Sequence, residues 1–331
     1  MLLTSNKFTD LQVLSPIQLN TRFLEDVLTG LNSYPKKLEA KYFYDKTGDL
    51  LFQKIMGCEE YYVTRAEAEI FQTHGGAIAI ALTADFAGFD LIELGAGDAS
   101  KTIHLLDELQ QMNTDFNYLP VDISEAMIRH LSQELPIKIP GLVVRGLHGE
   151  YLEMLKMAGQ IAKRSKAVLF LGSNIGNMNR EDALNFLKKV RLNLNKGDKM
   201  LIGIDLKKDP DTILSAYDDS SGYTRAFNLN LLARINRELN GSFDIDQFIH
   251  YPTYDPISGE CKSFLVSQQN QEVRISNDVI HFKRGEVIYM ELSQKYDLQE
   301  INDMATAAGF VSRSIFTDNK AWFIDAIWEC V

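Results

Sequence analysis

The segment Asp90–Lys101 constrains the fold of this chain more than any other part of the sequence. It reads Asp-Leu-Ile-Glu-Leu-Gly-Ala-Gly-Asp-Ala-Ser-Lys and leads into an amphipathic stretch through Leu105 and Leu106. An apolar run, a Gly-x-Gly turn and a helix start are typical of a buried strand whose turn brings backbone N–H groups up to a ligand. Ser100 occupies the position where a dinucleotide-binding fold needs its third glycine. The segment therefore predicts a nucleotide-type ligand but argues against a nicotinamide dinucleotide.

Composition and charge narrow the class of protein further. The 331 residues are 45% hydrophobic, enough for a large core in one elaborated domain or two. A net charge of −11 without a long run of Lys or Arg argues against nucleic acid as a partner. The three cysteines form no C-x-x-C pair and the six histidines are scattered, so we expect no metal. Neither a signal-peptide core nor a membrane-length apolar run is present, which predicts a cytoplasmic protein without membrane contact.

Strand and helix patterns alternate around the glycine turn. The expected strands are 90–94, 116–121, 141–146, 167–171 and 199–205, and the expected helices are 66–82, 124–134, 150–162 and 180–192. Short apolar strands separated by helices indicate a parallel sheet covered on both faces. The chain ends with an expected helix at 298–308 and a hairpin formed by 311–316 and 321–330. We therefore expect an α/β, Rossmann-like domain built from 63–205 and 298–331.

The remaining segments break this alternation and predict a second lobe of the α+β kind. Its expected elements include helices at 18–33 and 226–239 and strands at 279–283 and 287–294. Strand patterns with period two, mixed with helices outside the βαβ series, do not extend a parallel sheet. We assign residues 1–62 and 206–297 to this lobe.

Asp122 follows Gly97 by 25 residues and ends the next expected strand. A carboxylate at this strand tip can accept two hydrogen bonds from a ribose diol. The alternative is an N-terminal cap for the helix that begins near Ser124. The paired glycine motif favours the ligand role. Lys101, about one turn into the expected helix, can reach a carboxylate of the ligand or remain a solvated lysine.

Two further segments place polar groups where a substrate can bind. The strand 167–171 runs into the turn-rich segment 172–177, and strand ends of this kind line the ligand crevice in parallel sheets. Gly172 permits close approach, and Asn177 offers both a donor and an acceptor, although a plain loop is the alternative. Glu291 and Ser293 share one face of a strand and can pair with the two nitrogens of a neutral imidazole. A solvated glutamate is the simpler interpretation of this spacing.

Taken together, the motifs resemble one family. In chain order they are Tyr44-Asp, Glu60-Tyr-Tyr-x-Thr-Arg65, Leu94-Gly-x-Gly97, Phe170-Leu-Gly-Ser-x-Ile-Gly-Asn177, Ala216-Tyr-Asp-Asp219, Ala226-Phe-Asn228, Asn236-Arg-Glu-Leu239, Phe243-Asp and Glu291-Leu-Ser293. Over roughly 20–331 the chain resembles the histidine-specific methyltransferases of ergothioneine biosynthesis, which use S-adenosylmethionine (SAM) to trimethylate the α-amino nitrogen of L-histidine. The resemblance implies a class I methyltransferase sheet, a substrate lobe, SAM as cofactor and L-histidine as the small-molecule substrate.

The resemblance also implies a role for individual residues. Cofactor contacts fall on Gly95, Lys101, Asp122, Glu150 and Tyr151. Substrate contacts at the amino-acid end fall on Tyr61, Gly172, Asn177 and Tyr217, with Tyr61 and Asn177 orienting the reacting amine, and those at the imidazole end fall on Tyr44, Glu291 and Ser293. The chain departs from the family pattern at Glu59, Val63, Glu150, Tyr151 and Ser263. These departures bear on ring specificity and on the adenine contact more than on methyl transfer.

Two other functions stay open at the level of sequence. One is methylation of a different amino acid or an aromatic amine. Glu291 and Ser293 argue against an apolar ring, because burying them unpaired is costly. The other is a non-catalytic SAM-binding module, which would need no substrate lobe, so the segment 206–297 counts against it.

Overall fold

The computed structural model describes residues 16–161 and 164–331, and it divides into two compact units. Within the described residues, unit 1 consists of the chain up to Ile55, Ser221–Pro252 and Ser263–Glu291, and unit 2 of Met56–Ser220, Thr253–Lys262 and Leu292–Val331. No helix in these described ranges is long and apolar enough to cross a membrane.

The packing boundaries differ from the domain division expected from sequence. Residues 56–62, 206–220, 253–262 and 292–297 pack into unit 2, although the sequence groups them with the second lobe. The segment 1–15, expected in that lobe, and Ala162, the expected end of a helix, lie outside the described residues. The assignment of one part to the cofactor and the other to the substrate stays a prediction.

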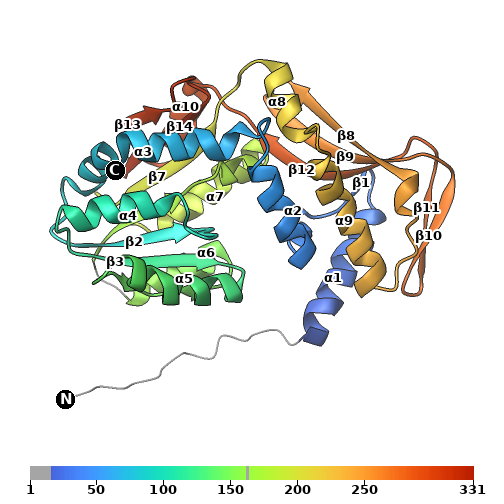
Figure 1. Ribbon diagram of the computed structural model, residues 1–331, viewed down its shortest axis with the longest axis horizontal. Coiled ribbons are helices and arrows are strands. Elements are labelled where there is room, and N and C mark those ends of the chain that lie inside the picture. Colours follow the sequence, from blue (N-terminus) through green and yellow to red (C-terminus); the bar gives the residue numbers. More distant parts are fainter. Residues whose placement is uncertain (1–15, 162–163) are drawn as a thin grey trace. The chain divides into compact units, whose positions relative to one another are not determined.

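Unit 2 is built on a mostly parallel sheet (Figure 1). Its strands are β2 (Phe89–Leu94), β3 (Phe116–Asp122), β4 (Val143–Val144), β5 (Leu147–His148), β6 (Ser165–Phe170), β7 (Lys199–Asp205), β13 (Phe310–Thr317) and β14 (Phe323–Cys330). The order is β13-β14-β7-β6-β2-β3-β4, and β5 also pairs with β3. In this order, the neighbours β7, β6, β2, β3 and β4 run parallel to one another. Strand β14 is antiparallel to both β7 and β13. The expected Rossmann-like sheet with a closing hairpin is confirmed.

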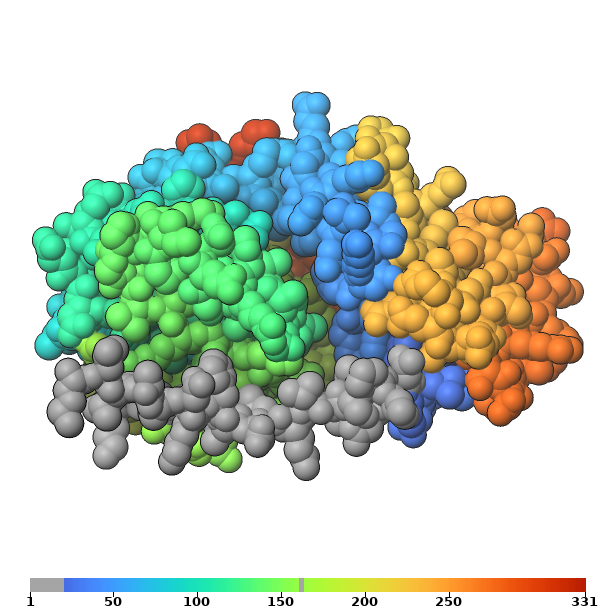
Figure 2. Space-filling view, turned by 60° about the horizontal axis from the view of Figure 1, so that its bottom comes forward, coloured from blue at the N-terminus to red at the C-terminus, as the bar shows by residue number. Residues whose placement is uncertain are grey.

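Helices cover both faces of this sheet. They are α3 (Tyr62–Thr83), α4 (Thr102–Gln111), α5 (Glu125–Lys138), α6 (Tyr151–Ile161), α7 (Arg180–Leu192), α8 (Pro210–Tyr217) and α10 (Leu298–Ala308). Side chains of α3, α4 and α5 share one buried cluster with Leu91 and Leu169. Those of α6, α7 and α10 share another with Ile92 and Val168, because successive strand residues face opposite sides. Figure 2 shows the green segment around α5 at the outer surface of unit 2.

The expected strand at 141–146 is wrong in its extent. The structure has the two short strands β4 and β5 instead, separated by Arg145 and Gly146. The backbone N–H of Arg145 still donates to Tyr118 O at 2.8 Å. At Gly146 a Cβ would lie 2.4 Å from Ile128 Cγ2, so the chain passes too close to α5 to carry a side chain. The interruption of the strand coincides with this close contact, which an apolar run does not reveal.

Unit 1 mixes helices with parallel and antiparallel strand pairs, as expected for an α+β lobe. Elements that lie in it wholly or in part are α1 (Pro16–Leu31), β1 (Lys36–Lys37), η1 (Ala40–Phe43), α2 (Lys46–Met56), α9 (Tyr223–Glu238), η3 (Ile245–Gln247), β8 (Phe248–Asp255), β9 (Glu260–Ser267), β10 (Gln271–Ile275), β11 (Asp278–Phe282) and β12 (Val287–Gln294). One sheet has the order β1-β12-β9-β8, and β10 pairs with β11. Along β12, Ile288 and Met290 are buried while Tyr289 and Glu291 are partly exposed, so the two faces differ.

Candidate active site

The glycine turn after β2 leaves bare backbone at the carboxyl edge of the sheet. Gly95 and Gly97 have φ angles of 77° and 51°, in the left-handed region that glycine adopts without strain. The backbone N–H groups of Gly95 and Ala96 donate to Val121 O at 2.8 and 3.2 Å, which ties the turn to β3. A Cβ placed on Gly97 would have no atom of the described protein within 4 Å. The turn is therefore fixed on one side and open on the other.

Asp122 connects this turn to the end of β3. Its Oδ2 accepts a hydrogen bond from the Gly97 N–H at 3.1 Å, and its Oδ1 accepts from the Ser124 N–H at 2.9 Å. Ser124 is the cap of α5, since its side chain accepts from Met127, so the alternative of Asp122 as the cap is wrong. A carboxylate has about four lone-pair positions, and the described residues occupy two. The ribose contact expected for the other two positions stays a prediction.

The structure brings Tyr151 to the same turn. Its hydroxyl oxygen lies 2.7 Å from the position of a Cβ on Gly95, and its ring packs edge-on against Phe170 with centroids 5.7 Å apart. Burial raises the pKa of Tyr151 to about 12, so the phenol stays neutral. Glu150 is exposed at the surface of unit 2. Of this pair, Tyr151 is the residue that reaches the glycine turn.

Lys101 is paired with a buried carboxylate that the sequence did not indicate. The residue stands just before α4, so its expected place one turn into the helix is wrong. Its Nζ forms an ion pair with Glu67 Oε2. Burial alone would lower the pKa of Lys101, but the Glu67 carboxylate raises this pKa above its ordinary value. Glu67 Oε1 also accepts from the Gly172 N–H at 2.7 Å. Glu67 thus links two predicted site residues.

A glycine inside β7 is the signal that could have indicated Glu67. A Cβ on Gly203 would lie 2.1 Å from Glu67 Oε1, so only glycine leaves room for this carboxylate. Gly203 interrupts a strand that is buried throughout, and a glycine in such a strand often marks close approach by another group.

The loop of residues 172–177 follows β6 and ends in the 3₁₀ turn η2 (Asn174–Asn177). Asn174 Nδ2 lies 3.2 Å from a Cβ position on Gly95 and 3.8 Å from one on Gly172. Asn177 is exposed at the far end of the turn. Asn174 therefore lies close to the glycine turn, a position that the sequence prediction did not consider. The role of Asn177 stays a prediction.

Tyr217 and Ser293 meet in a buried polar cluster of unit 2. The Tyr217 hydroxyl donates to Ser293 Oγ at 2.6 Å. Lys295 Nζ, fully buried, donates to both oxygens at 2.8 Å. The ring of Tyr61 lies edge-on to that of Tyr217, with centroids 6.2 Å apart. The structure thus joins three predicted substrate residues, although Tyr217 and Ser293 were assigned to opposite ends of the substrate.

The 172–177 loop packs directly against the strand end that carries this cluster. A Cβ on Gly176 would lie 2.8 Å from Gln294 O, which makes glycine necessary there. Ser173 Oγ accepts from the Asp205 N–H at 3.1 Å, and Asp205 in turn pairs with Lys295. The predicted transfer loop and the Tyr217–Ser293 pair are therefore neighbours within one rigidly bonded part of unit 2.

Tyr44 and Glu291 belong to unit 1. The ring of Tyr44 contacts that of Phe227 edge-on, with centroids 5.6 Å apart. Glu291 is partly exposed on β12. Ser263 is buried and hydrogen-bonds His250 Nε2 at 3.3 Å, so its hydroxyl has a partner on the neighbouring strand. The roles of Tyr44 and Glu291 at the imidazole end stay predictions.

Glu93, the acidic residue inside the glycine motif, is buried beneath the turn. Its Oε1 accepts from Thr102 Oγ1 at 2.6 Å, and its Oε2 accepts from the Tyr118 hydroxyl. Burial raises the pKa of Glu93 to about 7. Glu93 therefore holds β2, β3 and the start of α4 together and titrates near neutral pH.

We expect the Glu93→Gln variant to remove a pH-dependent part of the stability. Because the folded pKa lies above the unfolded value of about 4.3, Glu93 stabilises the folded state below that value and loses this effect as pH rises through 7. The stability of the wild type relative to Glu93→Gln should fall by up to about 3 kcal/mol between pH 4.5 and 8. Urea unfolding of both proteins across this range measures it. A difference that stays constant would contradict a raised pKa.

The fold and the site define a SAM-dependent methyltransferase of class I. The mostly parallel sheet closes with the expected antiparallel hairpin, and the open glycine turn lies at the carboxyl ends of its strands, where parallel sheets bind ligands. The chain belongs to the family of histidine-specific, SAM-dependent methyltransferases, whose sequence model matches residues 23–330.

Individual relatives span nearly the whole chain. It is 34% identical to the histidine N-alpha-methyltransferase of Mycolicibacterium smegmatis, over 88% of this chain and 90% of that protein. It is also 34% identical to the enzyme of the same name from Mycobacterium tuberculosis, over 90% and 92%. An L-tryptophan methyltransferase of Psilocybe serbica is 28% identical, over 90% of each protein. Relatives with different amino-acid substrates therefore share this architecture.

Proposed function

We propose that the protein trimethylates the α-amino nitrogen of L-histidine to give histidine betaine (hercynine), a step in ergothioneine biosynthesis. Membership of a histidine-specific family and the two mycobacterial relatives support this substrate. The observation that carries the proposal is the contact between the 172–177 loop and the strand end bearing Ser293, next to Tyr217. A cytoplasmic location, in keeping with three buried free cysteines, is part of the same proposal.

The residues around the glycine turn fit SAM. Gly97 leaves the outer face of the turn open, and Asp122 has two acceptor positions for a ribose diol. Tyr151 can pack beside the adenine, and Lys101 can attract the carboxylate of the methionine part. When bound, SAM supplies a methyl group attached to a positively charged sulfur. The protein must bring a neutral amine in line with that methyl group.

Positioning is the main contribution of the chain to the reaction. A correctly aligned reactant pair can lower a barrier by up to about 7–11 kcal/mol. Tyr61 and Asn177 are the candidates to orient the amine, and the amine must lose its proton before each transfer. The rings of Tyr61 and Tyr217 can stabilise the positively charged, methylated amino group of the product by cation–π contact. A nitrogen with three methyl groups has no lone pair left, so the reaction stops there.

Substrate identity is the direct test of this proposal. With SAM and an equimolar mixture of amino acids, L-histidine should be consumed fastest and gain the mass of three methyl groups in mass spectrometry. The tryptophan-methylating relative makes tryptophan the critical competitor. Faster consumption of tryptophan or tyrosine would place this chain among methyltransferases for other aromatic amino acids.

Glu291→Ala should lower kcat/KM for histidine at least tenfold. A hydrogen bond to a charged acceptor contributes about 1.5–3 kcal/mol, and the imidazole N–H would lose such a partner. Glu272→Ala, which removes an exposed carboxylate on β10, is the matched control and should leave kcat/KM unchanged. Equal activity of Glu291→Ala and the wild type would remove Glu291 from the ring site.

A further inference from the structure

We propose that Lys295 is a positioning residue for methyl transfer: its buried ammonium group fixes the hydroxyls of Tyr217 and Ser293 in the orientation that receives the substrate. The inference rests on the proposed function, because it assumes that these two hydroxyls bind the amino acid. It concerns a residue outside the recognised motifs and assigns it a specific task.

Lys295 uses all the donors that an ammonium group has. Its side chain is fully buried, and its Nζ lies 2.8 Å from the Tyr217 oxygen, 2.8 Å from Ser293 Oγ and 2.6 Å from Asp205 Oδ2. An ammonium group carries three hydrogens and no acceptor. Both hydroxyl oxygens therefore accept from Lys295.

This arrangement restricts where the hydroxyl hydrogens can point. One hydrogen lies in the 2.6 Å bond between Tyr217 and Ser293. Because Tyr217 is the donor in that bond, the Ser293 hydrogen is the one that can turn toward an acceptor on the substrate, either a carboxylate or the bare nitrogen of an imidazole. The ammonium group beneath the pair also favours an anionic partner at short range. Without Lys295 both hydroxyls can rotate, and the cost of ordering them falls on substrate binding.

Asp205 is the carboxylate partner of this buried lysine. Burial would raise the pKa of Asp205, but Lys295 and Lys208 hold it below its ordinary value, so the carboxylate is ionised. The Tyr62 hydroxyl donates to the same carboxylate at 2.9 Å. Asp205 thus has three partners and retains two when Lys295 is removed.

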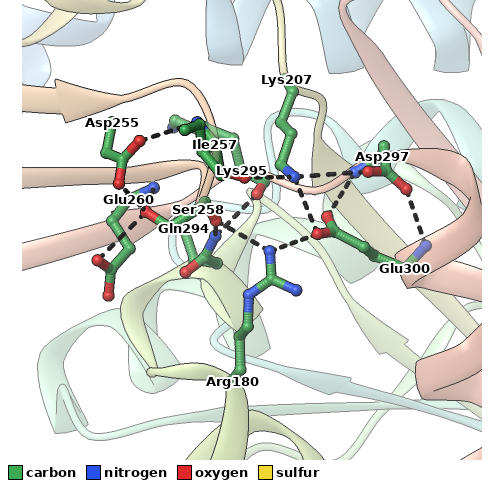
Figure 3. Close-up of polar contacts among 10 residues, drawn as sticks. All are labelled: Arg180, Lys207, Asp255, Ile257, Ser258, Glu260, Gln294, Lys295, Asp297 and Glu300. Atoms are coloured by element: carbon green, nitrogen blue, oxygen red, sulfur yellow. Dashed lines mark hydrogen bonds and ion pairs between the residues drawn. The ribbon is translucent and has the colours of Figure 1, made fainter.

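The backbone of this strand end is fixed by the β8–β9 hairpin, residues 255–260 (Figure 3). The N–H of Lys295 donates to Gly259 O at 2.7 Å, and Gln294 Nε2 donates to Ser258 O at 2.6 Å. A Cβ on Gly259 would lie 2.2 Å from Lys295 O, so the two chains are in close contact. Further hydrogen bonds to hairpin carbonyls come from two side chains of unit 2, Arg180 and Lys207. Lys295 is therefore held in place both by hydrogen bonds of its backbone and by the partners of its ammonium group.

Lys208 provides a matched control. It pairs with the other oxygen of Asp205 and, within the described residues, also donates to the Tyr62 hydroxyl and Leu206 O. Burial lowers the pKa of Lys208 to about 8. Lys208→Met and Lys295→Met each remove one cation from the same buried carboxylate. Only Lys295 contacts Tyr217 and Ser293.

Steady-state kinetics of the full-length variants with SAM and L-histidine test the proposal. Lys295→Met should lower kcat/KM for histidine at least thirtyfold, mainly through a higher KM, while the affinity for S-adenosylhomocysteine changes less than threefold. Lys208→Met should lower kcat/KM less than threefold. In a Tyr217→Phe/Ser293→Ala background, Lys295→Met should add less than a threefold loss, because its targets are gone.

Equal losses in Lys295→Met and Lys208→Met would reduce Lys295 to a counterion of Asp205 and overturn the proposal. A full additional loss in the Tyr217→Phe/Ser293→Ala background would overturn it too. If Lys295→Met does not fold, the double variant Asp205→Asn/Lys295→Met avoids an unpaired buried charge. Its kcat/KM should then be at least thirtyfold lower than that of Asp205→Asn. A wild-type enzyme that prefers another amino acid contradicts the proposed function, and the variants are then compared on that substrate.

Discussion

The Asp122→Ala variant should lose at least a hundredfold in affinity for S-adenosylhomocysteine. Both carboxylate oxygens hold backbone N–H groups of the turn and of the α5 start, and both retain acceptor positions for a ribose diol. A hydrogen bond to a charged acceptor contributes about 1.5–3 kcal/mol, so loss of two exceeds the roughly 2.8 kcal/mol that a hundredfold change requires. Isothermal titration calorimetry measures the affinity directly, without dependence on the amino-acid substrate.

Two neighbouring variants separate ligand binding from turn geometry. Asp122→Asn keeps one acceptor oxygen and should bind with intermediate affinity. Ser124→Ala removes the side-chain cap of α5 but leaves the backbone N–H that Asp122 accepts, so it should lower stability by about 0.5–2 kcal/mol and leave affinity unchanged. Full affinity in Asp122→Ala would move the ribose away from this carboxylate.

Most strands and helices of the sheet domain could be predicted because their signals are local. The apolar strands, the Gly-x-Gly turn and the helices at 180–192 and 298–308 each follow from periodicity over a few residues. The structure has α7 and α10 with those bounds. The edge of the sheet was less predictable, because the close approach of Gly146 to α5 is a tertiary contact that periodicity does not show.

The charged residues beneath the site could not be predicted in the same way. Glu67 acts on Gly172, which is 105 residues away, and Asp205 acts on Lys295 through a tertiary contact. In a sequence, a single Lys or Glu is expected to be solvated, since such side chains are rarely buried without a partner. Only the fold supplies the partner. The sequence can single out residues in a recognisable motif, but the buried charges that contact them appear only in the fold.

The largest combined loss of activity and stability is expected for Glu67→Gln. The fully buried Glu67 carboxylate pairs with Lys101 and accepts from the Gly172 N–H. Glutamine can keep the bond to Gly172 but not the ion pair. Removing one partner of a buried ion pair costs about 3–5 kcal/mol, reduced here because Lys101 is partly exposed. We expect kcat/KM to fall by about two orders of magnitude, on the order of 2.7 kcal/mol, and the unfolding midpoint in urea to fall with it.

A second buried carboxyl group, that of Asp325, lies beside Glu67. A Cβ on Gly203 would lie 3.1 Å from Asp325 Oδ1 and 2.1 Å from Glu67 Oε1. The two carboxyl groups are therefore close to each other. Burial, together with the charge of Glu67, raises the pKa of Asp325 well above its ordinary value. This direction favours the neutral form of Asp325 while Glu67 is present, and the ion pair of Lys101 is with Glu67.

The double variant Glu67→Gln/Lys101→Met distinguishes charge balance from positioning. Without either charge, the double variant should unfold at a higher urea concentration than Glu67→Gln or Lys101→Met alone, because no uncompensated ion remains buried. Its kcat/KM should nevertheless stay at the level of Lys101→Met, since both variants lack the ammonium group proposed to contact the cofactor. Urea unfolding and steady-state kinetics of the three variants give both quantities. Recovery of wild-type activity in the double variant would show that Lys101 serves only to neutralise Glu67 and makes no contact with the cofactor.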